Sequence, residues 1–154
     1  MSSADLSSVL GVRSVTGHGA AGFAVYDDSV NMTVVAHGFS RFLAAESCGQ
    51  CPPPKLDRAK QGSLSITERL AAILDGHGSD ELLGGLAALL RSVTDANRCL
   101  LGREERLVVS SILREFPEDV AAFLGHRAGS LREIHVPLID DVTDDGTVEY
   151  KRWP

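Results

Sequence analysis

A cysteine pair followed at once by three prolines is the feature that most constrains the fold. The pair is Cys48 and Cys51, spaced C-x-x-C, and the prolines occupy positions 52–54. Proline lacks a backbone N–H and restricts the residue before it, so this segment is expected to form a rigid loop and not a continuous helix. A helix that precedes the pair must therefore end near Ser47, and helical periodicity returns only from Ser63.

Apolar residues recur with helical spacing on both sides of this loop. Asn31 and Ser79 stand where helix N-caps are expected, and Gly76 stands where a helix should stop. The pattern predicts a mainly α fold, a small bundle of four to five helices. Helices are expected over residues 31–45, from Ser63 to Gly76, from Ser79 toward Asp95, over roughly 104–116, and from Pro117 to Gly125.

Both ends of the chain differ from this helical middle. A glycine-rich stretch leads into Phe23–Tyr26, which reads as a short N-terminal β segment. Near the other end, two apolar runs flank Asp144–Gly146, a signal for a β-hairpin, although a loosely held acidic tail is an alternative. The expected division is a glycine-rich lead-in at 1–30, a helical domain at 31–126, and a hairpin or tail at 127–154.

Composition excludes several classes of protein. The net charge is −6 over 154 residues, which disfavours nucleic-acid binding. Met1–Leu10 has neither a positive segment nor an apolar one, so it is not a signal peptide, and no apolar stretch reaches the roughly 20 residues of a membrane span. We therefore expect a cytoplasmic protein. Three cysteines with a C-x-x-C pair in a reducing compartment indicate metal or redox chemistry.

The segment Glu46–Lys55 resembles a run that reads E-S-C-G-x-C-x-P-C-[RK] in a known family. That family is the C-terminal iron–sulfur binding domain of the NADH-binding flavoprotein subunit of complex I-type NADH dehydrogenases, with related formate dehydrogenase and hydrogenase subunits. A further family cysteine follows in a segment like F-C-x-L-G, which is similar to Arg98–Gly102 here. Gly19–Asp28 and Ser110–Phe116 extend the resemblance over about residues 5 to 126.

The resemblance implies an iron–sulfur cluster held by Cys48, Cys51 and Cys99. These match the first, second and fourth family ligands, and all cysteines of the chain fall on such positions. The third ligand is replaced by Pro54, which removes both a sulfur and an N–H donor. The FMN- and NADH-binding region of the family is also absent, so neither FMN nor NAD is expected on this chain.

The missing ligand leaves three outcomes open. A [4Fe–4S] or [3Fe–4S] cluster can remain on three cysteines, with a non-protein group, a carboxylate or a histidine as a fourth ligand. The same thiolates can instead hold zinc. Finally, the site can be empty, with the bundle acting as a degenerate, cluster-free module for protein interaction. Candidate neighbours of the gap are Gln50, Lys55, Asp57, His18 and His37.

No catalytic motif is present, and Gly17-x-Gly19-x-x-Gly22 precedes a strand where a dinucleotide site would follow one. The leading hypothesis is therefore an accessory protein that binds an iron–sulfur cluster and passes electrons within a larger oxidoreductase assembly. Its partner would be an oxidoreductase or biosynthetic enzyme subunit, and no residue is expected to act as acid, base or nucleophile.

Overall fold

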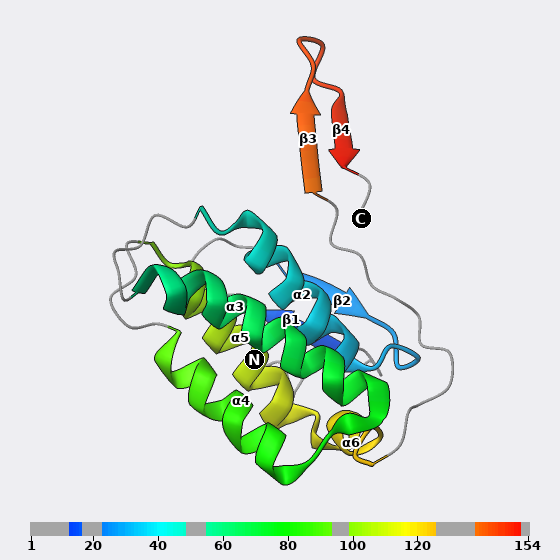
Figure 1. Cartoon of the computed structure of the whole chain (residues 1–154). Coiled ribbons are helices and arrows are strands. Elements are labelled where there is room, and N and C mark those ends of the chain that lie inside the picture. Colours follow the sequence, from blue (N-terminus) through cyan, green and yellow to red (C-terminus); the bar gives the residue numbers. More distant parts are fainter. Residues whose placement is uncertain (1–12, 17–22, 49–54, 94–98, 126–137, 152–154) are drawn as a thin grey trace.

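The computed structural model describes residues 13–16, 23–48, 55–93, 99–125 and 138–151. In these ranges the chain forms a mainly helical bundle with a short β-hairpin toward each end (Figure 1). None of the described helices is long and apolar enough to cross a membrane. The helices are α2 (Met32–Glu46), α3 (Lys55–Ala72), the π-helical turn η1 (Ile73–His77), α4 (Asp80–Ser92), α5 (Leu101–Glu115) and α6 (Pro117–Ala121).

Helices α2, α3, α4 and α5 run alternately up and down the bundle (Figure 1). Helix α2 packs against α3 and α5, and α4 packs against the same two helices. Because the direction alternates, the end of α2, the start of α3, the end of α4 and the start of α5 lie at one end of the bundle. We call this the cysteine end, since Cys48 follows α2 and Cys99 precedes α5.

The core is the shared apolar interior of these helices. Each helix contributes a stripe of aliphatic side chains, and Phe123 closes the bundle near α6. Fully burying one such side chain stabilises the fold by about 1.5–3 kcal/mol. The fully buried apolar side chains include Met32, Ile66, Leu70, Ile73, Leu86, Val109, Ile112 and Phe123.

The predicted helix caps are confirmed. The Asn31 side chain accepts a hydrogen bond from the Thr33 N–H at 2.8 Å, and the Ser79 hydroxyl accepts one from the Leu82 N–H at 3.2 Å. Helix α2 ends with Ser47 as its C-cap, directly before the cysteine pair. Gly76 adopts a φ of 85°, a conformation that favours glycine, and it interrupts the helical backbone where the sequence predicted a stop.

A second support for the start of α2 comes from α6. The carboxylate of Asp119 accepts a hydrogen bond from the Met32 N–H at 2.6 Å, and the Asn31 side-chain amide donates to the Asp119 carbonyl at 3.1 Å. This contact could not be predicted from the sequence, because its partners are far apart in the chain. It satisfies an N–H that every helix start leaves without an intrahelical partner.

Several helix boundaries differ from the prediction, and α6 ends at Ala121, four residues before the expected Gly125. Helix α3 begins at Lys55, well before Ser63, and α5 begins at Leu101, three residues earlier than expected. The first two turns of α3 are mostly charged or polar, so they lack the apolar stripe by which the helix was found. Their residues are good helix formers, and a helix can begin directly after a proline.

Both terminal β elements are antiparallel pairs. Strand β2 (Phe23–Tyr26) pairs with β1 (Arg13–Thr16), which the sequence analysis had not identified. The predicted C-terminal hairpin is confirmed as β3 (Leu138–Val142) and β4 (Val148–Lys151), with a register shift between Ile139 and Asp141. It stands away from the helices in Figure 1.

The turn of the C-terminal hairpin is held by its own polar groups. Gly146 has a φ of 84°, and its N–H donates to the Thr143 carbonyl at 2.8 Å. The Asp145 carboxylate accepts hydrogen bonds from the Thr143 hydroxyl and the Thr147 N–H, which lower the pKa of Asp145 to about 2.

We predict that Asp119→Ala destabilises the fold by about 1–3 kcal/mol, because it leaves the buried Met32 N–H without an acceptor. Urea denaturation followed by circular dichroism measures this difference. Glu118→Ala is the matched control, since Glu118 is an exposed neighbour on α6. Equal unfolding midpoints for the two variants contradict the assigned role of Asp119.

Candidate functional site

The structure places two of the three predicted ligands at the same end of the bundle. Cys48 follows the C-cap of α2, and Cys99 lies two residues before the start of α5. Both are free thiols, and both are exposed. Cys51 and Pro54 fall in residues 49–54, outside the described ranges. The helices between the pair and Cys99 therefore return the chain to the end from which it left, as a shared site requires.

The thiols of Cys48 and Cys99 are the type of ligand that iron–sulfur clusters use. Thiolates are soft ligands that hold iron–sulfur clusters and zinc, and loops at helix ends let sulfurs from different segments converge. Within the described ranges, no group of three or more His, Cys, Asp or Glu side chains is placed to hold a metal ion. Cys51 lies outside these ranges.

The other predicted neighbours are placed only in part. His37 is half-buried on α2, about three helical turns or roughly 16 Å along the axis before Cys48, so the helix does not bring it to the thiol. Lys55 and Asp57 lie in the first turn of α3, at the cysteine end. His18 and Gln50 lie outside the described residues.

A buried polar cluster lies just inside the cysteine end, and the sequence analysis missed it. The carboxylate of Glu105 on α5 accepts hydrogen bonds from the hydroxyls of Ser40 on α2 and Ser63 on α3. All three side chains are fully buried, with no exposed surface. We call these residues the Ser40–Ser63–Glu105 cluster.

Burial dominates the electrostatics of this cluster. It raises the pKa of Glu105 above the ordinary 4.5, because removing a carboxylate from water disfavours its charged form. The two serine hydrogen bonds act in the opposite direction and are the smaller effects. A buried acid of this kind is costly unless its oxygens have partners, and each of the two oxygens has one.

The spacing of apolar residues along α5 could have shown that Glu105 is buried. It lies one turn before Val108 and Val109 and two turns before Ile112, all of which are buried. A carboxylate on that stripe is an exception, since Glu is rarely fully buried without partners. Its two serine partners lie 65 and 42 residues away, so the sequence alone could not name them.

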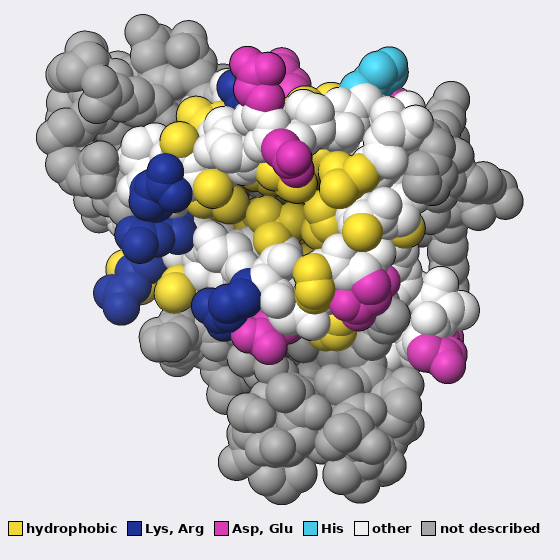
Figure 2. Space-filling model, turned by 90° about the horizontal axis from the view of Figure 1, so that it is seen from below, with side chains coloured by type: hydrophobic (Ala, Val, Ile, Leu, Met, Phe, Trp, Pro, Cys, Tyr) yellow, Lys and Arg dark blue, Asp and Glu magenta, His cyan; other side chains and the backbone are white. Residues whose placement is uncertain are grey.

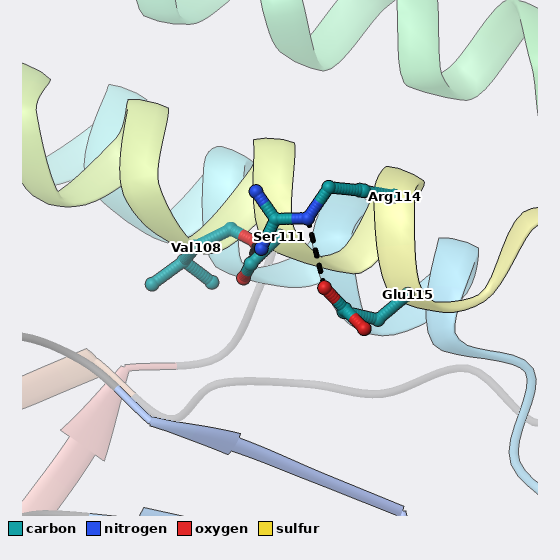
Figure 3. A network of polar contacts seen from close by, with 4 residues as sticks. All are labelled: Val108, Ser111, Arg114 and Glu115. Carbon is teal, nitrogen blue, oxygen red and sulfur yellow. Dashed lines mark hydrogen bonds and ion pairs between the residues drawn. The ribbon is translucent and has the colours of Figure 1, made fainter. Parts of the chain in front are cut away.

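Polar contacts further along α5 are of a different kind. Figure 3 shows Arg114 and Glu115 pointing toward one another, with a 2.8 Å ion pair, and these side chains are 72% and 42% exposed. Nearby, the Ser111 hydroxyl donates to the Val108 carbonyl at 2.8 Å. Exposed pairs contribute about 0–1 kcal/mol, so they do not organise the site.

The described helices define a small antiparallel helical domain, with Cys48 and Cys99 at one of its ends. Residues 34–123 match the family model described as the NADH-ubiquinone oxidoreductase-F iron-sulfur binding region. The chain belongs to this family.

Two curated proteins illustrate the relationship. The chain is 30% identical over 118 residues to the NADP-reducing hydrogenase subunit HndC of Solidesulfovibrio fructosivorans. It is 27% identical over 109 residues to the mitochondrial NADH-ubiquinone oxidoreductase 51 kDa subunit of Neurospora crassa. These matches cover 77% and 71% of this chain, but only 23% and 21% of the relatives.

Two solved structures have a similar fold. An NAD+-reducing [NiFe]-hydrogenase in the H2-reduced state is similar with a TM-score of 0.58 and 27% identity, covering 66% of this chain and 17% of that one. The air-oxidized state of such a hydrogenase also has a TM-score of 0.58, with 26% identity, covering 70% and 18%. The predicted resemblance is thus confirmed.

We predict that Glu105→Gln changes how stability depends on pH in the metal-free protein. Between the ordinary pKa of 4.5 and the raised pKa of folded Glu105, the folded chain keeps a proton that the unfolded chain has lost. The free energy of unfolding contributed by Glu105 therefore falls as pH rises through this interval. Glutamine does not titrate, so the fall is expected to disappear.

Urea denaturation of both proteins across a pH series from below 4 to 8 measures this difference. Glu104→Gln is the matched control, since it makes the same substitution one residue away on a half-buried side chain. If the curves of wild type and Glu105→Gln stay parallel throughout, Glu105 does not titrate abnormally.

Proposed function

We propose that the chain binds an iron–sulfur cluster and passes electrons within a larger oxidoreductase assembly. Cys48, Cys51 and Cys99 are the proposed ligands. The observation that carries the proposal is the return of Cys99 to the end of the bundle at which Cys48 lies. Membership of an iron–sulfur binding family supports the same cofactor.

The exposure of the proposed ligands suits electron transfer. Cys48 and Cys99 both lie at the surface of the described structure, so a centre held by them is close to any protein docked at the cysteine end. When bound, the cluster supplies the one-electron redox chemistry. The part left to the chain is to hold the sulfurs in place and to set the charge around them.

Pro54 leaves one position of a four-thiolate site without a protein ligand. We propose that the three cysteines still retain a cluster, either as a three-iron form or with the fourth iron bound by a group from outside the described residues. A donor from a partner chain is the version that best suits an accessory subunit. Relatives are subunits of hydrogenase and NADH-ubiquinone oxidoreductase, which supports a partner oxidoreductase.

We predict that protein purified without oxygen contains iron and acid-labile sulfide in matching amounts, with a brown visible spectrum. Serine replacement of Cys48, Cys51 or Cys99 is expected to remove most of the iron and sulfide, because all three thiolates are needed to hold the proposed cluster. Iron and sulfide assays, with circular dichroism to confirm folding, measure the outcome. A folded wild-type protein without iron or sulfide overturns the proposal.

We predict that Pro54→Cys raises cluster occupancy and slows its loss to a chelator, because a fourth thiolate completes the coordination. Pro53→Cys is the matched control, since it adds a thiol at a spacing that the family pattern does not use. Equal iron content and loss rates in both variants show that position 54 does not face the site.

A cluster-free interaction module is the second candidate, and the C-terminal hairpin is the observation that favours it. Val142 and Val148 are paired across β3 and β4, and their side chains are exposed, as is that of Tyr150. Figure 2 also shows apolar side chains gathered on the face of the bundle seen from below. A colourless protein whose Cys→Ser variants melt at the wild-type temperature supports this candidate; loss of stability on chelation of zinc indicates a zinc site instead.

A further inference from the structure

The Ser40–Ser63–Glu105 cluster links helices α2, α3 and α5. At the cysteine end, these helices adjoin the proposed iron–sulfur ligands in the sequence. Glu105 lies four residues into α5, roughly 6 Å along the helix axis from its start. Ser40 lies about two turns before Cys48, and Ser63 about two turns after the start of α3. A fully buried carboxyl thus occupies the first layers of the bundle behind the cysteine end.

We propose that Glu105 takes up a proton when negative charge is added at the cysteine end, so that reduction of a cluster held there is coupled to protonation of this carboxyl. The inference rests on the proposed function. One electron arrives from the donor in the partner oxidoreductase, and one proton arrives from solvent at a carboxylate oxygen of Glu105. The net charge of the region stays constant, and no bond to a cysteine sulfur breaks.

The physical reason is the dielectric environment. Charges a few helical turns apart interact more strongly through a packed interior than through water. Glu105 has no exposed surface, and among the described residues two neutral hydroxyls stabilise its carboxylate. An added negative charge nearby raises the energy of the ionised form further, so a carboxyl whose charge is already disfavoured gains a proton more readily than any exposed acid.

Within the described ranges, burial and neutral partners set the pKa of Glu105. The pKa of Glu105 is shifted by burial and by the two serine hydrogen bonds, with no charged side chain of the described residues among the causes. Each helix packed around Glu105 also carries charged or titratable residues. Those with described side chains are His37 and Arg41 on α2, Glu68 and Arg69 on α3, Arg91 on α4, Arg103, Glu104 and Arg106 on α5, and Asp119 on α6.

The hydroxyl partners allow both protonation states. With Glu105 ionised, both serines donate to it. With Glu105 protonated, its own O–H donates, and one serine hydroxyl rotates to accept it. Serine on a helix can redirect its own proton to a backbone carbonyl of the preceding turn, as Thr67 does toward the Ser63 carbonyl at 2.8 Å. The exchange therefore needs rotation of one hydroxyl and no movement of a helix.

The test is the midpoint potential of the anaerobically purified protein as a function of pH, measured after its iron and sulfide content. In wild type the potential is expected to fall as pH rises above 4.5, across the titration range of Glu105, and in Glu105→Gln it is expected to stay level. Glu104→Gln, the control with the same substitution, is expected to behave as wild type.

A second variant separates proton coupling from a purely structural role. Replacing Ser40 and Ser63 by alanine removes the hydrogen bonds that lower the pKa of Glu105, so the pH-dependent region is expected to move to higher pH. A role in packing alone shifts the potential equally at every pH.

Each outcome bears on one proposal or both. Folded protein without iron or sulfide overturns the proposed function and this inference together. A bound cluster whose potential is independent of pH, or depends on pH equally in wild type and Glu105→Gln, overturns the inference and leaves the proposed function standing.

Discussion

The burial of α2 between α3 and α5 is the interaction on which the rest of the structure depends. Its apolar stripe includes Met32, Val35 and Ala36, which lie in the common core. This packing fixes the direction of α2, and the alternation of the following helices then brings the ends of four helices together. The relation between Cys48 and Cys99, which are separated by two long helices, is a consequence of this packing and not of any local contact.

The sequence predicted those features that depend on local chemistry. Helix caps at Asn31 and Ser79, the stop at Gly76 and the C-terminal hairpin around Gly146 could be identified because each needs a particular side chain or backbone conformation at one position. The mainly helical class followed from periodicity. The family was identified from the spacing of the cysteines, because apolar periodicity alone does not distinguish one helical family from another.

Features that depend on packing between distant segments could not be predicted. Asp119 supports the start of α2 from 87 residues away, and Glu105 meets its serines across three helices. No spacing rule connects such partners. The early start of α3 was missed for a related reason, since helix propensity without an apolar face gives no periodic signal. In the candidate site, Cys48 and Cys99 lie at the same end of the bundle, while the roles of Cys48, Cys51 and Cys99 as ligands stay predictions.

The exposure of Cys48 and Cys99 leaves both thiols open to oxidation. Accessible thiols are the ones that oxygen and peroxide convert to sulfenic acid or to disulfides, whereas buried thiols are protected. Two such groups at the same end of one bundle also allow two copies to become linked through that end. The same openness thus leaves both thiols accessible to oxidants in air.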